Sequence, residues 1–78
     1  MKEVKLKYKS AGNENLSIII IDGAGRKVKS IHIVTEPGEH DVQWDGKNDR
    51  GEMVASGIYY FLIDLNGQKY GKKLVLLK

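Results

Sequence analysis

The stretch that decides the fold reads Ile58-Tyr-Tyr-Phe-Leu-Ile-Asp-Leu65, then Asn66-Gly67, then Gln68-Lys-Tyr-Gly-Lys-Lys-Leu-Val-Leu-Leu77. Its first part is the longest predicted strand of the chain. Asn-Gly is the dipeptide that two-residue hairpin loops prefer, because both central residues of a type I′ turn need positive φ. The sequence therefore predicts a β-hairpin in which residues 68–77 return beside residues 58–65.

The same period of two recurs along the rest of the chain, and turn residues interrupt it repeatedly. Glycines, Pro37-Gly38 and the oxygen-rich stretch 45–51 supply those turns. No segment is predicted to form a helix. The pattern predicts an all-β, antiparallel two-sheet sandwich of about seven strands, with short strands at residues 26–28, 30–34 and 53–56 among them.

Length and composition limit the chain to one small domain spanning residues 1–78. The chain has thirteen Lys and Arg and ten Asp and Glu. It has no cysteine, which excludes disulfides and thiolate metal sites. The cations are mostly lysines, which is weak ground for nucleic-acid binding, so no nucleic-acid partner is predicted. The first residues lack the apolar core of a signal peptide, and the longest apolar run, Ile18 to Ile21, is too short for membrane insertion.

Strand parity separates residues expected in the core from residues expected outside. Lys5, Lys7 and Lys9 form one face of the first strand, which suits an edge strand. Residues 16–22 should form a central strand. Its second face is unusually apolar, and so is the outward face of residues 58–65. The residues predicted to bind a partner protein across these two faces are Ile19, Ile21, Ile58, Tyr60 and Leu62.

Two alternatives stay open for these five residues: a bulge could shift the strand parities, or the C-terminal strand could cover the apolar surface that they form.

Trp44 shares its parity with Val42 and is predicted to enter the core, where truncation of an indole costs about 3 to 5 kcal/mol. The functional alternative for Trp44 is a sugar-stacking platform, with Tyr60 as the second aromatic. Tyr59 follows Gly57, where immunoglobulin-like sandwiches place a tyrosine whose hydroxyl bonds back to the backbone.

The remaining polar clusters favour structural roles. Asp45, Asn48, Asp49 and Glu52 lie within eight residues but fail the calcium-loop spacing, which favours turn capping. Neither histidine has a second ligand at metal spacing, and no serine has a placeable His and Asp. The sequence predicts no enzyme, no cofactor and no metal. Gly51 and Gly57 are predicted to occupy positive-φ turn or bulge positions.

Five stretches resemble, in order and spacing, the immunoglobulin-like domain first described in the flagellar hook-capping protein (FlgD): Leu16–Val28, Gly38–Gly46, Asp49–Gly51, Val54–Phe61 and Lys72–Lys78. The resemblance covers about four-fifths of the chain and implies an immunoglobulin-like sandwich. Its most specific residues, to which it implies structural roles, are Trp44, Asp45, Gly46, Gly51, Gly57 and Tyr59.

Similar domains end many exported bacterial proteins, where they resemble the sorting domains of the type IX secretion pathway. The chain also ends on a basic and apolar strand, although it lacks the Asn-Pro segment usual in sorting domains. The resemblance implies a non-catalytic accessory module, at the C-terminus of an exported or cell-surface bacterial protein, acting in secretion, anchoring or protein docking. The alternatives are a flagellar hook-cap assembly domain and a carbohydrate-binding module. The domain is expected to be monomeric in isolation and to work outside the cell or at its surface.

Overall fold

The hairpin at residues 57–76 forms as the sequence predicts. In the computed structural model, which describes residues 4–77, β5 (Gly57–Leu65) pairs with β6 (Gln68–Leu76) along its whole length. Leu65 lies opposite Gln68, so Asn66 and Gly67 alone make the turn. Their φ angles are 50° and 90°, both in the left-handed region that a type I′ turn requires.

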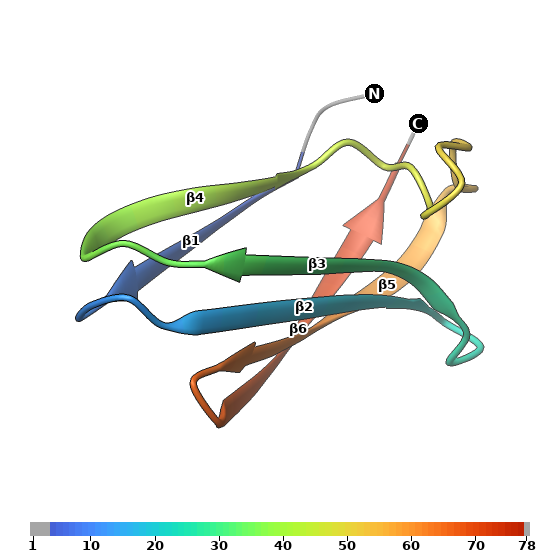
Figure 1. The fold of residues 1–78 in the computed structure, drawn as a ribbon. Helices are drawn as coiled ribbons and strands as arrows, with labels where there is room; N and C mark the ends of the chain where they lie inside the picture. The colour runs from blue at the N-terminus through green and yellow to red at the C-terminus, as the bar shows by residue number, and fades with distance from the viewer. Residues whose placement is uncertain (1–3, 78) are drawn as a thin grey trace.

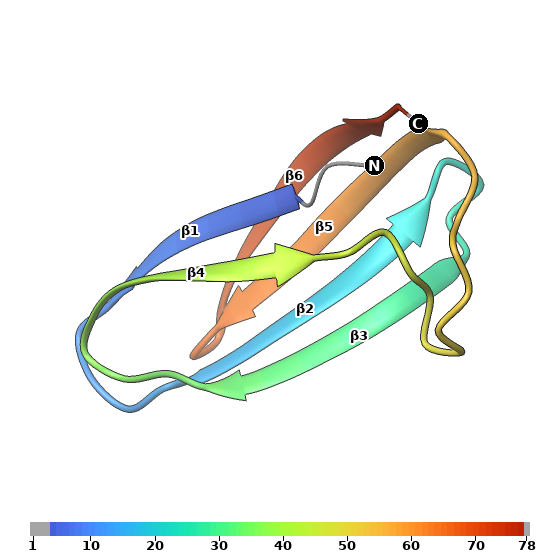
Figure 2. The same cartoon turned by 90° about the horizontal axis from the view of Figure 1, so that it is seen from above.

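The described residues form six strands in two antiparallel sheets that face each other (Figure 1). Four strands make one sheet, in the order β3-β2-β5-β6, and β1 and β4 make the other. Figure 2 shows the two-stranded sheet lying over the larger one. The remaining bounds are β1 (Val4–Ser10), β2 (Asn15–Asp22), β3 (Lys27–Val34) and β4 (Gly38–Trp44).

The fold confirms the all-β, two-sheet prediction with six strands where about seven were expected. The short strands expected at 26–28 and 30–34 are one strand, β3. Residues 53–56 form no strand, because Met53 makes only an isolated bridge with Lys47. Within residues 4–77, no helix has the length and apolar character needed to span a bilayer.

The core lies between the inner faces of the sheets. β2 is the central strand, between β3 and β5, and buries one of its faces completely. Trp44 of β4 contacts the rings of Tyr59 and Phe61 edge-on, at centroid distances of 5.5 and 5.8 Å. These edge contacts add stabilisation to the burial of apolar area. The buried hydrophobic residues are Leu6, Leu16, Ile18, Ile20, Val42, Trp44, Tyr59, Phe61 and Leu76.

A buried pair of hydroxyls joins two of the three places where the chain crosses between sheets. Ser10 ends β1 and Thr35 follows β3, and their hydroxyl oxygens are 2.8 Å apart. Thr35 Oγ1 also donates to Gly12 O and accepts from Glu14 N–H. Burial of a hydroxyl is costly unless it is hydrogen-bonded, so this satisfied network fixes both crossings.

Candidate functional site

The outward face of the four-stranded sheet carries apolar side chains that are exposed or half-buried. In the pairing of β2 with β5, Ile19 lies opposite Leu62 and Ile21 lies opposite Tyr60. Ile19, Leu62 and Ile58 are 37%, 44% and 42% exposed. Ile21 and Tyr60 are half-buried. The predicted parities are confirmed, because all five residues share one face of two adjacent strands.

Neither alternative for this surface holds. The register shift of β2 lies on its β3 side, between Ile20 and Ile21, and leaves the register with β5 intact. The C-terminal strand β6 pairs with the edge of β5 and does not cover its face. It extends the surface instead, because Val75 lies opposite Ile58 and is 56% exposed. We call Ile19, Ile21, Ile58, Tyr60, Leu62 and Val75 the outward stripe.

A hollow of about 480 Å³ adjoins the outward stripe. It exists because Gly71 lies opposite Leu62, and a β-carbon at Gly71 would meet no atom within 4 Å. Ile19 and Leu62 give the hollow an apolar wall, with the charged side chains of Asp64 and Lys69 among its lining residues. Such a site suits an apolar side chain from a protein partner, with polar contacts around it.

Sequence reasoning missed Val75 and Gly71 as members of this surface. The signal was present: once the Asn66-Gly67 loop is known to have two residues, the register of the hairpin is fixed. That register places Val75 opposite Ile58 and Gly71 opposite Leu62. The wider surface therefore follows from the turn and from strand parity together.

Trp44 is a core residue, as its parity predicts. Its side chain is 2% exposed, and its indole N–H donates to Lys47 O at 2.9 Å. The sugar-stacking alternative for Trp44 is wrong, because a ring buried on both faces cannot stack on a ligand. Asp45 Oδ1 accepts from Lys47 N–H, and Gly46 has a φ of 79°, so both shape the turn that follows β4.

Tyr59 makes the backbone contact expected of it. Its hydroxyl donates to Ala55 O at 2.6 Å. Burial raises the pKa of the Tyr59 phenol, and the negative charge of Asp22 raises it further. The neutral, donating phenol is therefore the form that the fold favours.

Asp22 ends β2 and organises the turn to β3. Backbone N–H groups of Arg26 and Ala24 donate to its Oδ1, and the Arg26 side chain donates to Oδ2 at 3.0 Å. The hydrogen bond from the Arg26 backbone is the largest cause that lowers the pKa of Asp22. The glycine-rich segment at 23–25 is thus a hairpin turn, held by a carboxylate.

The two turn glycines behave differently. Gly51 has a φ of 79°, so its predicted positive φ is confirmed. The prediction for Gly57 is wrong: its φ is not positive, because Gly57 is the first residue of β5 and pairs with Leu76 in extended geometry. The sequence motif around Gly57 therefore marks the start of a strand.

The oxygen-rich loop uses its side chains to accept hydrogen bonds from its own backbone and from the backbone of β3. Asn48 Oδ1 accepts from the N–H groups of Arg50 and Glu52, and Asp49 Oδ1 accepts from Ser30 N–H. These bonds agree with the turn-capping prediction. No group of three or more His, Cys, Asp or Glu side chains able to hold a metal ion occurs in residues 4–77.

Two sheets, a buried tryptophan between them and a tyrosine hydroxyl bonded back to the chain define an immunoglobulin-like β-sandwich. The model of the FlgD Ig-like domain family matches residues 2–68. The chain belongs to this family.

A solved structure has the same fold. The crystal structure of FLGD from P. aeruginosa superposes with a TM-score of 0.70 at 24% sequence identity. The match covers 96% of this chain and 61% of that one, so the chain spans less than two-thirds of the solved protein. No curated protein sequence matches the chain significantly. The similarity to type IX sorting domains stays a prediction.

Proposed function

We propose that the chain is a non-catalytic docking domain that takes part in protein assembly through the outward stripe. The observation that carries the proposal is the pairing of apolar residues across β2 and β5 on a face that no other strand among residues 4–77 covers. Burial of this surface against a partner releases water from apolar area, at about 25 cal/mol per Å². The hollow beside Leu62 supplies a place for one anchoring side chain.

Within this class we favour assembly of the hook-cap type over secretion or surface anchoring. Membership of the FlgD Ig-like family supports it directly, and the fold shared with FLGD agrees with it. The sorting role rests on the C-terminal sequence alone. Both roles place the domain outside the cell or at its surface as part of a longer protein, and this location belongs to the proposal.

Carbohydrate binding is the weaker alternative. It needs exposed aromatic rings grouped on one face. Trp44 is buried, and Tyr60 is half-buried on the outward stripe. Tyr70 is 53% exposed and lines the hollow, so the described residues offer one strongly exposed ring and one half-buried ring there, not a platform of exposed rings.

The test replaces Tyr60 by Ser and Leu62 by Lys together within the full parent protein. Asn13→Lys is the matched control, because it adds the same charge at an exposed position in the loop between β1 and β2, outside the outward stripe. Thermal unfolding of the isolated domain shows that both variants fold. Surface display of the parent and assembly of its partner structure, including flagellar hooks where the host builds them, are then measured separately.

We expect the double variant to lose assembly while display and the control are unchanged. Loss of display with a folded domain would transfer the function to secretion or anchoring. If the double variant both assembles and is displayed like the parent, the outward stripe is not an interface and the proposal fails.

A further inference from the structure

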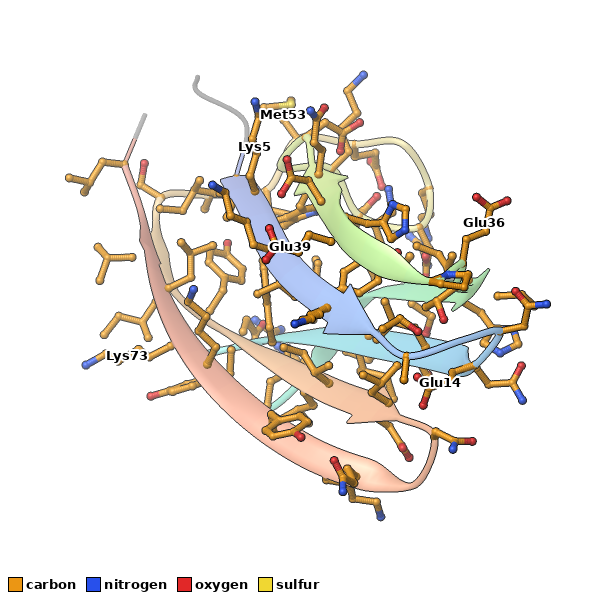
Figure 3. All side chains as sticks on the ribbon, turned by 90° about the vertical axis from the view of Figure 1, so that its left-hand side faces the viewer. Lys5, Glu14, Glu36, Glu39, Met53 and Lys73 are labelled. Atoms are coloured by element: carbon orange, nitrogen blue, oxygen red, sulfur yellow. The ribbon has the colours of Figure 1, made fainter. Side chains whose placement is uncertain are left out.

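The charges of the molecule are divided between its two sides. β1 and β6 together contain six lysines, all exposed, and no carboxylate. The rest of the described chain, within residues 4–77, has nine carboxylates and five cations. β1 and β6 run along the same lateral side of the sandwich in two views (Figures 2 and 3), and Figure 3 labels Lys5 and Lys73. The two strands on this side of the sandwich are therefore basic, although Asp41 and Glu39 of β4 lie opposite Lys7 and Lys9 and the chain has a net charge of only +3. We call the strands β1 and β6 the basic flank.

The basic flank also contains two unpaired strand edges, because within residues 4–77 β6 pairs with β5 only and β1 is likewise an edge strand. β1 pairs with β4 only, so among the described residues its second edge has no backbone partner. β3 differs, because the loop after β4 covers part of its free edge: Asp49 N–H donates to Val28 O, and Ser30 N–H donates to the Asp49 carboxylate. An open edge presents a row of N–H and C=O groups to which an extended peptide can add as a strand.

The side chains of β1 define which peptide fits. Lys5, Lys7 and Lys9 lie on the outward face at every second position, so they repeat about every 6.8 Å. An added strand has the same repeat, and carboxylates at alternate positions would each lie beside a lysine. On the other face of β1, Val4 and Tyr8 are only half-buried. Apolar residues at the intervening positions of the peptide would cover them.

We propose that the free edge of β1 binds an extended segment of a partner protein in which acidic and apolar residues alternate, as an added strand of the two-stranded sheet. The same lysines disfavour pairing of β1 with β1 of a second copy, because like charges would then lie side by side. A folded nucleic acid matches less well, since the six cations are all lysines and none offers the bidentate arginine fork. The site lies on the other sheet from the outward stripe and does not depend on it.

The probe is a blocked heptapeptide of alternating Glu and Val, titrated into the isotope-labelled domain and followed by NMR. We expect saturable shifts at the backbone amides of residues 4–10 and slower exchange of those amides with solvent. A peptide with N-methyl groups at every second residue keeps its charge but loses backbone donors, and it should not bind. Equal binding of the methylated peptide, or shifts spread evenly over all surface lysines, would overturn the proposal.

Charge reversal tests the lysines themselves. The triple variant K5E/K7E/K9E should bind the peptide about tenfold more weakly, since three exposed ion pairs become repulsive contacts. It should bind the corresponding Lys and Val peptide instead, which shows that the edge is still folded. The matched control K27E/K29E/K47E carries the same change of charge away from the basic flank and should bind the acidic peptide within about twofold of the parent.

Three further outcomes count against the inference. Anionic vesicles or a heparin oligosaccharide that bind residues 4–10 while the peptide does not would assign the basic flank to a membrane or a polyanion. Shifts in Gly38–Trp44 that grow with protein concentration, without peptide, would assign the edge to β4 of a second copy, whose outward residues include Glu39 and Asp41. Binding that survives in K5E/K7E/K9E would remove the lysines from the site.

Discussion

The two outward faces of the sandwich have opposite chemistry. On the two-stranded sheet, Lys7 lies opposite Asp41 and Lys9 lies opposite Glu39, so the solvent-exposed face carries rows of charged side chains. On the four-stranded sheet, the corresponding positions of β2 and β5 pair Ile19 with Leu62 and Ile21 with Tyr60. A solvated antiparallel face normally alternates apolar inside with polar outside. The first face follows that rule, whereas the second departs from it, and this departure is the basis for proposing a partner on the outward stripe.

The strongest test of this contrast compares the two faces of one strand. Ile18 and Ile19 are adjacent in β2, but Ile18 is 1% exposed and Ile19 is 37% exposed. Ile18→Ala should lower the free energy of unfolding by about 2 to 5 kcal/mol, since it leaves a cavity in the core. Ile19→Ala should cost less than about 1 kcal/mol. Urea denaturation measures both, and equal losses would mean that Ile19 is retained for stability and not for binding.

Gly51 and Gly57 offer a second contrast, between a turn and the strand that begins beside the outward stripe. Gly51→Ala should destabilise the domain by about 1 kcal/mol or more, because the φ of 79° strains any L side chain. Gly57→Ala should be neutral or slightly stabilising, since an added β-carbon meets nothing within 4 Å in an extended backbone. Thermal melts of the two variants decide the point, and a costly Gly57→Ala would show that the start of β5 needs glycine for another reason.

Much of this architecture is present in local sequence. Asn66-Gly67 predicts its hairpin because the turn needs positive φ at two adjacent residues, and few other residues accept it. Trp44 and the stripe residues follow from parity, since a strand points alternate side chains to opposite faces. The candidate surface was thus predictable from sequence, apart from Val75 and Gly71, which need the register of β6 as well.

What sequence did not predict depends on partners distant in the chain. Ser10 and Thr35 are 25 residues apart, and nothing local to either residue indicates a buried hydroxyl pair. Gly57 follows a serine in a segment rich in turn residues, and only its pairing with Leu76 shows that it belongs to a strand. The open edge of β1 likewise appears only when the sheet order is known.

The same contrast between core and outward face is expected at two adjacent tyrosines, with a smaller difference in stability. Tyr59→Phe removes the 2.6 Å hydrogen bond to Ala55 O and should cost about 1 kcal/mol. Tyr60→Phe, on the outward stripe, should change stability by less than about 0.5 kcal/mol. The phenol of Tyr59 has a pKa raised above its ordinary value of 10.0, so its contribution is present below pH 10 and lost as the pH rises through the folded pKa. Alkaline unfolding should therefore weaken the wild-type advantage over Tyr59→Phe, and an advantage that grew with pH would contradict the direction given for the pKa.

The smallest effect concerns the charged face. Lys7→Glu places a carboxylate directly opposite Asp41, and like charges across a strand pair destabilise by about 0.2 to 1 kcal/mol. Both side chains are exposed, so 1 M salt should remove most of the difference. The matched variant on the apolar face is Ile19→Thr, which keeps a β-branched side chain and adds no charge, and whose stability should not depend on salt beyond the general effect on the parent. Melts at low and high salt measure the pair. If Lys7→Glu lowers stability equally at both salt concentrations, its effect does not come from a screened surface charge. The charged face would then contribute to stability by another route, and the contrast between the two outward faces would not hold.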